Sequence, residues 1–197
     1  MKETGILVAG SGGQGILLLG RLIAYGGMLE GKEVTCFPSY GAEVRGGTAN
    51  STVIISDDLI GSPILRNPDV LIVMNEASLK KFQPKLKQKG VMLFDSSLVG
   101  SSELRPDIRA VGIPATDIAS SIGEGAPSQE GAALSASRVR SANMVMLGAL
   151  VAVTGVLKTE NVLSALEKLT AAKRGKTLKG NREAIRKGIE YFADKKS

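Results

Sequence analysis

The sequence contains no histidine, no tryptophan and a single cysteine, Cys36, among its 197 residues. Without histidine, the chain has no imidazole for general acid–base catalysis or for metal ligation. One thiol can neither close an internal disulfide nor supply the ligands of an iron–sulfur cluster. Much of redox and hydrolytic chemistry is therefore unavailable to this chain alone.

Long apolar runs are also missing. No stretch approaches the roughly 20 residues that a membrane span needs, and residues 1–4 lead into a short apolar run and a glycine turn rather than a cleavable signal. We therefore expect a cytoplasmic protein. The hydrophobic fraction of 43% is enough for a real core, and aromatics make up only 4%. We expect one domain over residues 1–197 with an aliphatic core.

The charge is uneven along the chain. The formal net charge is +6, and the whole excess of lysine and arginine falls in residues 158–197. A basic segment can bind nucleic acid or an acidic protein, but no series of aromatic side chains alternates with the charges for base stacking. The simpler interpretation is a solvated helix face.

Strand and helix patterns alternate over residues 1–122. Apolar or β-branched runs predict strands at residues 5–9, 34–37, 48–56, 69–74, 91–94 and 108–113. Helices are predicted at residues 15–30, 77–89 and 116–122; Gly31 and Gly90 end the first two, and Pro38 ends the second strand. This order predicts an α/β fold, Rossmann-like and three-layered (αβα), with a mostly parallel sheet and C-terminal helices.

The C-terminal part is predicted to be helical. Residues 143–153 are apolar almost all round, which predicts a buried helix or one covered by another subunit. If the domain cannot cover this helix, the isolated chain should pair with itself or with its partners. Residues 123–140 are predicted to be a mobile excursion. Apolar spacing marks two further helices, at Leu163, Leu166 and Leu169, and at Ile185, Ile189 and Phe192.

The strongest chemical signal is GSGGQG at residues 10–15, which satisfies G-x-G-x-x-G between a predicted strand and a predicted helix. Glycines there allow a tight turn and let an anionic group approach the N–H donors of a helix N-terminus. A dinucleotide site usually adds an acidic residue about 20 positions further on, but the second strand here ends in Phe37 and Pro38. The glycines serve either an anion site or only a tight strand-to-helix crossing.

A second glycine-rich segment, PSYGAEVRGG, spans residues 38–47. Arg45 is a planar bidentate donor that suits a phosphate or carboxylate, although a surface pair with Glu43 in a hairpin-like connection fits the spacing equally well. Both glycine segments are expected at the carboxyl ends of strands, where open parallel sheets bind ligands. Asp95 is a third candidate, more typical of a cap for Ser96 and neighbouring amides than of a catalytic acid.

Three segments together resemble a known family. They are GSGGQGI at residues 10–16, PSYGAEVRGG at residues 38–47 and NMVMLG at residues 143–148. They resemble the gamma subunits of 2-oxoacid:ferredoxin oxidoreductases, with the 2-oxoglutarate (ketoglutarate) branch most similar and the pyruvate enzymes next. The resemblance covers residues 4–170 and departs from the family at residues 123–140.

The resemblance implies a subunit of an oxidoreductase that is not itself the redox centre. Alpha and beta subunits, with a delta subunit as a further candidate, would carry thiamine diphosphate and the iron–sulfur clusters. The complex would oxidatively decarboxylate a 2-oxoacid to an acyl-CoA and reduce ferredoxin. This chain would bind no cofactor alone; it would shape the CoA side of the active site and a subunit interface. The residues implied are Gly10, Gly12, Gly13, Gln14, Gly15, Ser39, Tyr40, Glu43, Arg45, Gly46 and Gly47, with no catalytic or metal-binding residue.

Two other classes of protein remain open. A free-standing nucleotide-binding oxidoreductase would hold NAD or FAD in the first glycine segment, and the missing ribose acid counts against it. A module for nucleic acid or an acidic protein would use the basic C-terminal helices, and its binding would depend steeply on salt.

Overall fold

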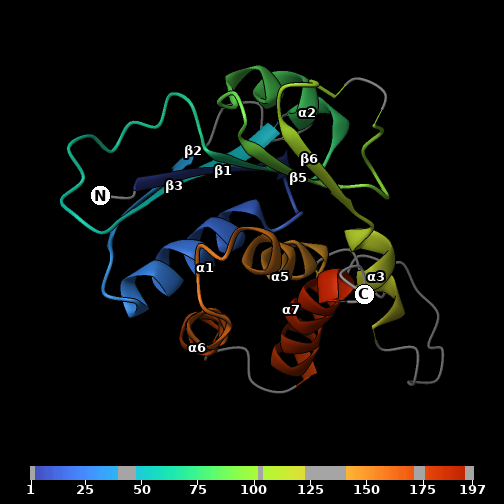
Figure 1. The fold of residues 1–197 in the computed structure, drawn as a ribbon. Helices are drawn as coiled ribbons and strands as arrows, with labels where there is room; N and C mark the ends of the chain where they lie inside the picture. Colours follow the sequence, from blue (N-terminus) through green and yellow to red (C-terminus); the bar gives the residue numbers. More distant parts are fainter. Residues whose placement is uncertain (1–2, 40–47, 102–103, 123–140, 171–175, 194–197) are drawn as a thin grey trace.

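A mixed six-stranded sheet forms the centre of the computed structural model (Figure 1). The structure describes residues 3–39, 48–101, 104–122, 141–170 and 176–193. β1, β4, β5 and β6 pair in parallel, and β3 runs antiparallel to its neighbours β1 and β2. The predicted α/β fold with a mostly parallel sheet is confirmed. In spatial order the strands are β2 (Glu33–Ser39), β3 (Thr48–Ser56), β1 (Glu3–Ser11), β4 (Val70–Val73), β5 (Val91–Asp95) and β6 (Arg109–Ile113).

The central strands are unbroken apolar runs because both of their faces are buried. In β4, Val70 and Ile72 join the larger core on one face, while Leu71 and Val73 join the smaller core on the other. This division follows from strand geometry, since successive side chains of a strand point to opposite faces. The sheet therefore separates two hydrophobic cores.

Helices cover both faces of the sheet (Figure 1). α1 (Ile16–Leu29) and α5 (Ala142–Thr154) pack on one face, and α2 (Glu76–Phe82) with the 3-10 helix η1 (Gln83–Lys85) covers the other. α3 (Ala115–Ser121) follows β6. α6 (Thr159–Leu169) packs on α1, and α7 (Lys176–Ala193) packs on α5. The predicted C-terminal helices thus form an outer tier beneath the helices that touch the sheet.

The apolar helix α5 is covered within the chain itself. All its residues from 142 to 151 are buried, and α7 supplies most of the cover. The two helices touch at glycines: a Cβ on Gly148 would collide with the Ile185 carbonyl oxygen, and one on Gly188 with the Val145 carbonyl oxygen. The prediction of a buried helix is confirmed, and this helix no longer gives a reason to expect pairing with a second subunit.

Two boundaries predicted from the sequence are wrong. The helix predicted over residues 77–89 ends at Phe82 and tightens into η1, because Pro84 has no N–H for a helical bond. Gly90 consequently precedes β5 and ends no helix. Strand β2 continues through Pro38 to Ser39, which an edge strand tolerates because one side of its backbone has no neighbouring strand to pair with.

The predicted excursion at residues 123–140 lies outside the described residues. Within those that are described, none of the helices combines the length and apolar character that crossing a membrane demands.

Candidate functional site

Residues 10–15, called the glycine turn below, lie at the carboxyl ends of the parallel strands. β1 leads through this turn into α1 on one face of the sheet, whereas its parallel neighbour β4 leads into α2 on the other face (Figure 1). Neighbouring strands whose connections leave to opposite faces mark the topological switch point, where open α/β sheets bind ligands. The glycine turn therefore occupies the favoured place for a binding site in this fold.

Gln14 holds the glycine turn together. Its Oε1 accepts the Ser11 N–H at 2.7 Å, and its Nε2 donates to the Met74 carbonyl at 2.8 Å. A Cβ on Gly10 would lie only 2.7 Å from that Oε1. Gly10 and Gln14 thus have structural roles in the turn. The Gln14 side chain connects the turn after β1 to the end of β4.

The other glycines of the turn either have a left-handed backbone conformation or are exposed to solvent. Gly13 has a φ of 90° and Gly15 a φ of 73°, in the left-handed region that glycine adopts without steric cost. Gly12 and Gly13 are exposed, and beyond its chain neighbours no atom of the described residues lies within 4 Å of a Cβ built on Gly13. The outer rim of the turn is accessible backbone that a ligand can approach closely.

The N-terminus of α1 has no cap of its own. Gly15 precedes the helix without a side-chain hydrogen bond, and no acidic residue lies in the first turn. The first amides of a helix have no intrahelical acceptor, and the helix dipole adds partial positive charge at this end. An anion placed beside Gly12 and Gly13 would accept hydrogen bonds from these amides and would interact favourably with the helix dipole, as at other glycine-rich helix starts.

Asn75 follows β4 and was not among the predicted site residues. Its Nδ2 donates to Ser11 Oγ, and its Oδ1 accepts the Ser78 N–H at 2.8 Å to cap α2. An Asn directly between an apolar strand and a helix is a recognisable cap signal in the sequence. Asn75 thus joins the start of α2 to the glycine turn.

Asn143 also contacts the glycine turn and was missed as a site residue. Its side chain is buried in the first turn of α5, and Nδ2 donates to the Gly15 carbonyl at 3.1 Å. The signal in the sequence is an isolated amide at the start of a helix that is otherwise apolar.

The second glycine-rich segment begins and ends beside the first. Ser39 ends β2 and pairs with Asn50, while Thr48 begins β3 and pairs with Ser11 of the glycine turn. The strands on either side form an antiparallel pair, as the hairpin-like interpretation requires. Five predicted site residues lie outside the part of the chain that the structure describes: Tyr40, Glu43, Arg45, Gly46 and Gly47.

Asp95 has a structural role at the end of β5. Its side chain is fully buried. Oδ1 accepts the N–H groups of Ser97 at 3.1 Å and Thr116 at 3.3 Å, and Oδ2 accepts the Thr116 hydroxyl at 2.6 Å. These bonds join β5 to the start of α3, as a cap for neighbouring amides would. The predicted cap for Ser96 is wrong, because the Ser96 N–H donates to the Ile113 carbonyl at 2.8 Å.

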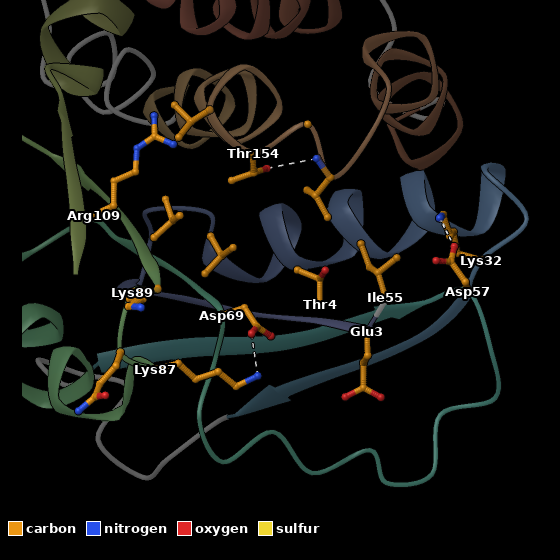
Figure 2. Close-up of a pocket in the computed structure, with 17 residues that line it drawn as sticks. Glu3, Thr4, Lys32, Ile55, Asp57, Asp69, Lys87, Lys89, Arg109 and Thr154 are labelled. Atoms are coloured by element: carbon orange, nitrogen blue, oxygen red, sulfur yellow. Dashed lines mark hydrogen bonds and ion pairs between the residues drawn. The ribbon is translucent and has the colours of Figure 1, made fainter. Parts of the chain in front are cut away.

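A cavity of about 520 Å³ lies at the opposite edge of the sheet, among the amino ends of the strands (Figure 2). Two of its lysines are paired: Lys87 with Asp69 at 2.7 Å, and Lys32 with Asp57, whose hydrogen bond raises the pKa of the lysine. Arg109 points towards the C-terminal end of α5, where a cation is favoured by the helix dipole. None of the predicted site residues lines this cavity, so we place the candidate site at the glycine turn.

Relatives of known designation match almost the whole chain. Ketoisovalerate oxidoreductase subunit VorA of Methanothermobacter marburgensis is 33% identical over 192 residues, covering 96% of this chain. This chain spans only 37% of VorA. The 2-oxoglutarate synthase subunit KorC of Archaeoglobus fulgidus is 35% identical over 190 residues, covering 96% of this chain and 88% of KorC.

Solved structures agree with these relatives. The gamma subunit of a keto/oxoacid ferredoxin oxidoreductase from Geobacter sulfurreducens has a TM-score of 0.73 and 32% identity, covering 95% of this chain and 96% of that one. The 2-oxoglutarate:ferredoxin oxidoreductase from Magnetococcus marinus, solved with 2-oxoglutarate, coenzyme A and succinyl-CoA bound, has a TM-score of 0.80 and 27% identity. It covers 95% of this chain, which spans 30% of that one.

A protein-family model also matches most of the chain. The family model of pyruvate ferredoxin/flavodoxin oxidoreductase matches residues 5–191, which include the glycine turn and Asn143. The chain belongs to the pyruvate ferredoxin/flavodoxin oxidoreductase family.

Proposed function

We propose that this chain is the gamma subunit of a multi-subunit 2-oxoacid:ferredoxin oxidoreductase, in which it shapes the CoA side of the active site and a subunit interface. The complex converts a 2-oxoacid and CoA into an acyl-CoA and carbon dioxide, and the electrons pass to ferredoxin. The partners of this chain are then the alpha and beta subunits, with a delta subunit as a further candidate, CoA, and ferredoxin through the complex.

The observation that carries the CoA assignment is the uncapped N-terminus of α1 behind the glycine turn. CoA bears phosphate groups, and backbone amides at a helix start bind phosphate without a charged side chain. The exposed rim at Gly12 and Gly13 lets such a group approach the backbone. Further support comes from the Magnetococcus marinus enzyme of similar fold, which was solved with coenzyme A bound.

The substrate class is a 2-oxoacid, with 2-oxoglutarate favoured and pyruvate next. KorC subunits of 2-oxoglutarate synthases match this chain over most of their own length. The pyruvate synthase subunit PorC of Thermotoga maritima does so at 30% identity. The VorA match, to a ketoisovalerate enzyme, supports the class and not one member of it.

Thiamine diphosphate and the iron–sulfur clusters are assigned to the partner subunits. The sequence has no histidine and one cysteine, and the described ranges hold no group of three His, Cys, Asp or Glu side chains suited to a metal ion. Thiamine diphosphate supplies the carbanion chemistry of decarboxylation. The residues of this chain bind and orient: the first amides of α1 receive an anionic part of CoA, while Gln14 and Asn75 keep the turn in place.

Two glycines form a matched pair that tests the CoA assignment. Gly13 and Gly31 both have a left-handed φ and open space where a side chain would begin, but only Gly13 belongs to the glycine turn. Each change to alanine costs about 1–2 kcal/mol of backbone strain. In the assembled enzyme, Gly13→Ala should raise the apparent CoA constant about tenfold, equivalent to about 1.4 kcal/mol, because the methyl group keeps the phosphate away from the backbone.

Gly31→Ala should leave the apparent CoA constant unchanged and serves as the control. Decarboxylation of the 2-oxoacid before CoA enters should be unaffected in both variants. An assembled Gly13→Ala enzyme with an unaltered CoA constant would remove the glycine turn from the CoA site.

A further inference from the structure

Asn143 is a buried amide that reaches the glycine turn from a distant part of the chain. It lies 128 residues after Gly15, and its side chain is only 1% exposed. Nδ2 donates to the Gly15 carbonyl oxygen at 3.1 Å. Oδ1 is buried and accepts no hydrogen bond from any residue that the structure describes.

The two ends of this amide differ in what they contribute. A buried acceptor without a donor is unfavourable, and a leucine of similar size would avoid that cost in an apolar helix. The hydrogen bond that Asn143 does make goes to the turn that we assign to CoA. The useful part of the side chain is therefore the Nδ2 donor.

The bond to Gly15 determines where a neighbouring amide points. The C=O of Gly15 and the N–H of Ile16 belong to one planar trans peptide group and point in opposite directions. The carbonyl accepts Nδ2 of Asn143 and also the Leu19 N–H at 3.0 Å. With the carbonyl held along the helix by two donors, the Ile16 N–H is directed out of the N-terminus of α1, towards the side where an anion would bind.

Gly15 is fitted to this contact. A Cβ at Gly15 would collide with Nδ2 of Asn143, and its φ of 73° also favours glycine. The amide of Asn143 thus occupies the space that a side chain on Gly15 would take. Two segments far apart in the sequence together fix one peptide group.

We propose that Asn143 is a positioning residue for CoA binding: it fixes the Gly15–Ile16 peptide group so that the first amides of α1 are oriented before the ligand arrives. This inference rests on the proposed function, because it assigns a role at the same site. Asn143 itself, being buried, does not touch CoA. Its effect on affinity is carried by the backbone of the turn.

The test is Asn143→Leu in the assembled enzyme. The change removes the Nδ2 donor and the unpaired Oδ1 together, and the Gly15 carbonyl keeps its bond from Leu19. Thermal stability should therefore change little. The apparent CoA constant should rise about tenfold, while the rate at saturating CoA and the decarboxylation step before CoA enters stay the same. Asn143→Ala should give the same rise if the leucine variant does not assemble.

Thr170→Val is the matched control. Thr170 is also buried, and its hydroxyl donates to the Leu166 carbonyl at 2.6 Å at the end of α6. Its loss should lower thermal stability and leave the CoA constant unchanged. An Asn143→Leu enzyme that loses stability but binds CoA normally would show that Asn143 is only an anchor between helices, and would overturn the inference.

The isolated chain provides a readout independent of turnover. In ¹⁵N-edited NMR spectra, Asn143→Leu should shift the Ile16 amide resonance, and an unshifted resonance would overturn the proposal. The Gly13→Ala result separates the two hypotheses. If Gly13→Ala weakens CoA binding and Asn143→Leu does not, the proposed function stands and the role of Asn143 fails; if neither does, both fail.

Discussion

At the scale of single residues, the glycines of the turn are not equivalent. Gly13 faces open space, whereas Gly15 faces the Asn143 amide at close range. We expect Gly15→Ala to lower the free energy of unfolding by more than Gly13→Ala, because it adds a collision to a backbone strain of about 1–2 kcal/mol. Urea denaturation of the three variants Gly13→Ala, Gly15→Ala and Gly31→Ala measures this, and equal midpoints would contradict it.

Site residues that belong to a local motif could be predicted from the sequence, whereas residues that act through contacts between distant segments could not. Gly10, Gly12 and Gly15 are the glycines of a local motif with a mechanism, so the turn between strand and helix could be predicted. Asn75 and Asn143 act across the fold, and no local spacing links residue 143 to residue 15. Only the packing of α5 beside the start of α1 makes that contact, and packing is not encoded in a motif.

At the scale of helices and strands, the contact between α5 and α7 depends on Gly148 and Gly188. Because a Cβ at either position would collide with a backbone carbonyl, neither helix can relieve the overlap by turning a side chain. We expect Gly148→Ala to cost about 1–3 kcal/mol or more of unfolding free energy, measured by urea denaturation.

Gly180, which lies in α7 as Gly188 does, is the control for that prediction. Nothing lies within 4 Å of a Cβ built there, and alanine favours a helix over glycine by about 0.5–1 kcal/mol. Gly180→Ala should therefore leave stability unchanged or raise it. A Gly148→Ala variant as stable as Gly180→Ala would mean that the helices are not in close contact.

Element boundaries were predictable where the pattern was strong and failed where tertiary context decides. The strand at residues 48–56 was predicted with its observed bounds, since β-branched residues run through it. Residues 77–89 were predicted as one helix that ends at Gly90, but Pro84 ends the regular bonding. Pro38 was predicted to stop β2; only the position of β2 at the sheet edge makes proline acceptable there.

At the scale of the whole molecule, the basic C-terminal part contains exposed ion pairs. Arg182 pairs with Glu167 across α6 and α7, and Lys187 pairs with Glu190 at 3.6 Å along α7. Exposed pairs of this kind add little stability. They pair two of the basic side chains with acidic side chains of the described helices; the solvated helix face stays a prediction.

The purified chain should be colourless and inactive on its own. With no histidine and one cysteine, it cannot supply the ligands of an iron–sulfur cluster. We expect an absorbance spectrum without flavin or cluster bands, and no 2-oxoacid- and CoA-dependent reduction of ferredoxin until partner subunits are added. A chromophore that remains bound through gel filtration, or turnover by the chain alone, would contradict this.

The antiparallel strand β3 also affects how this protein can diversify. All nine residues of β3 pair with β1, and β2 pairs along its opposite edge. These ladders hold Ser39 and Thr48 in register whatever number of residues joins them, and lengthening a loop costs little loop-closure entropy. The sheet should therefore keep its register when the number of residues between positions 39 and 48 is changed.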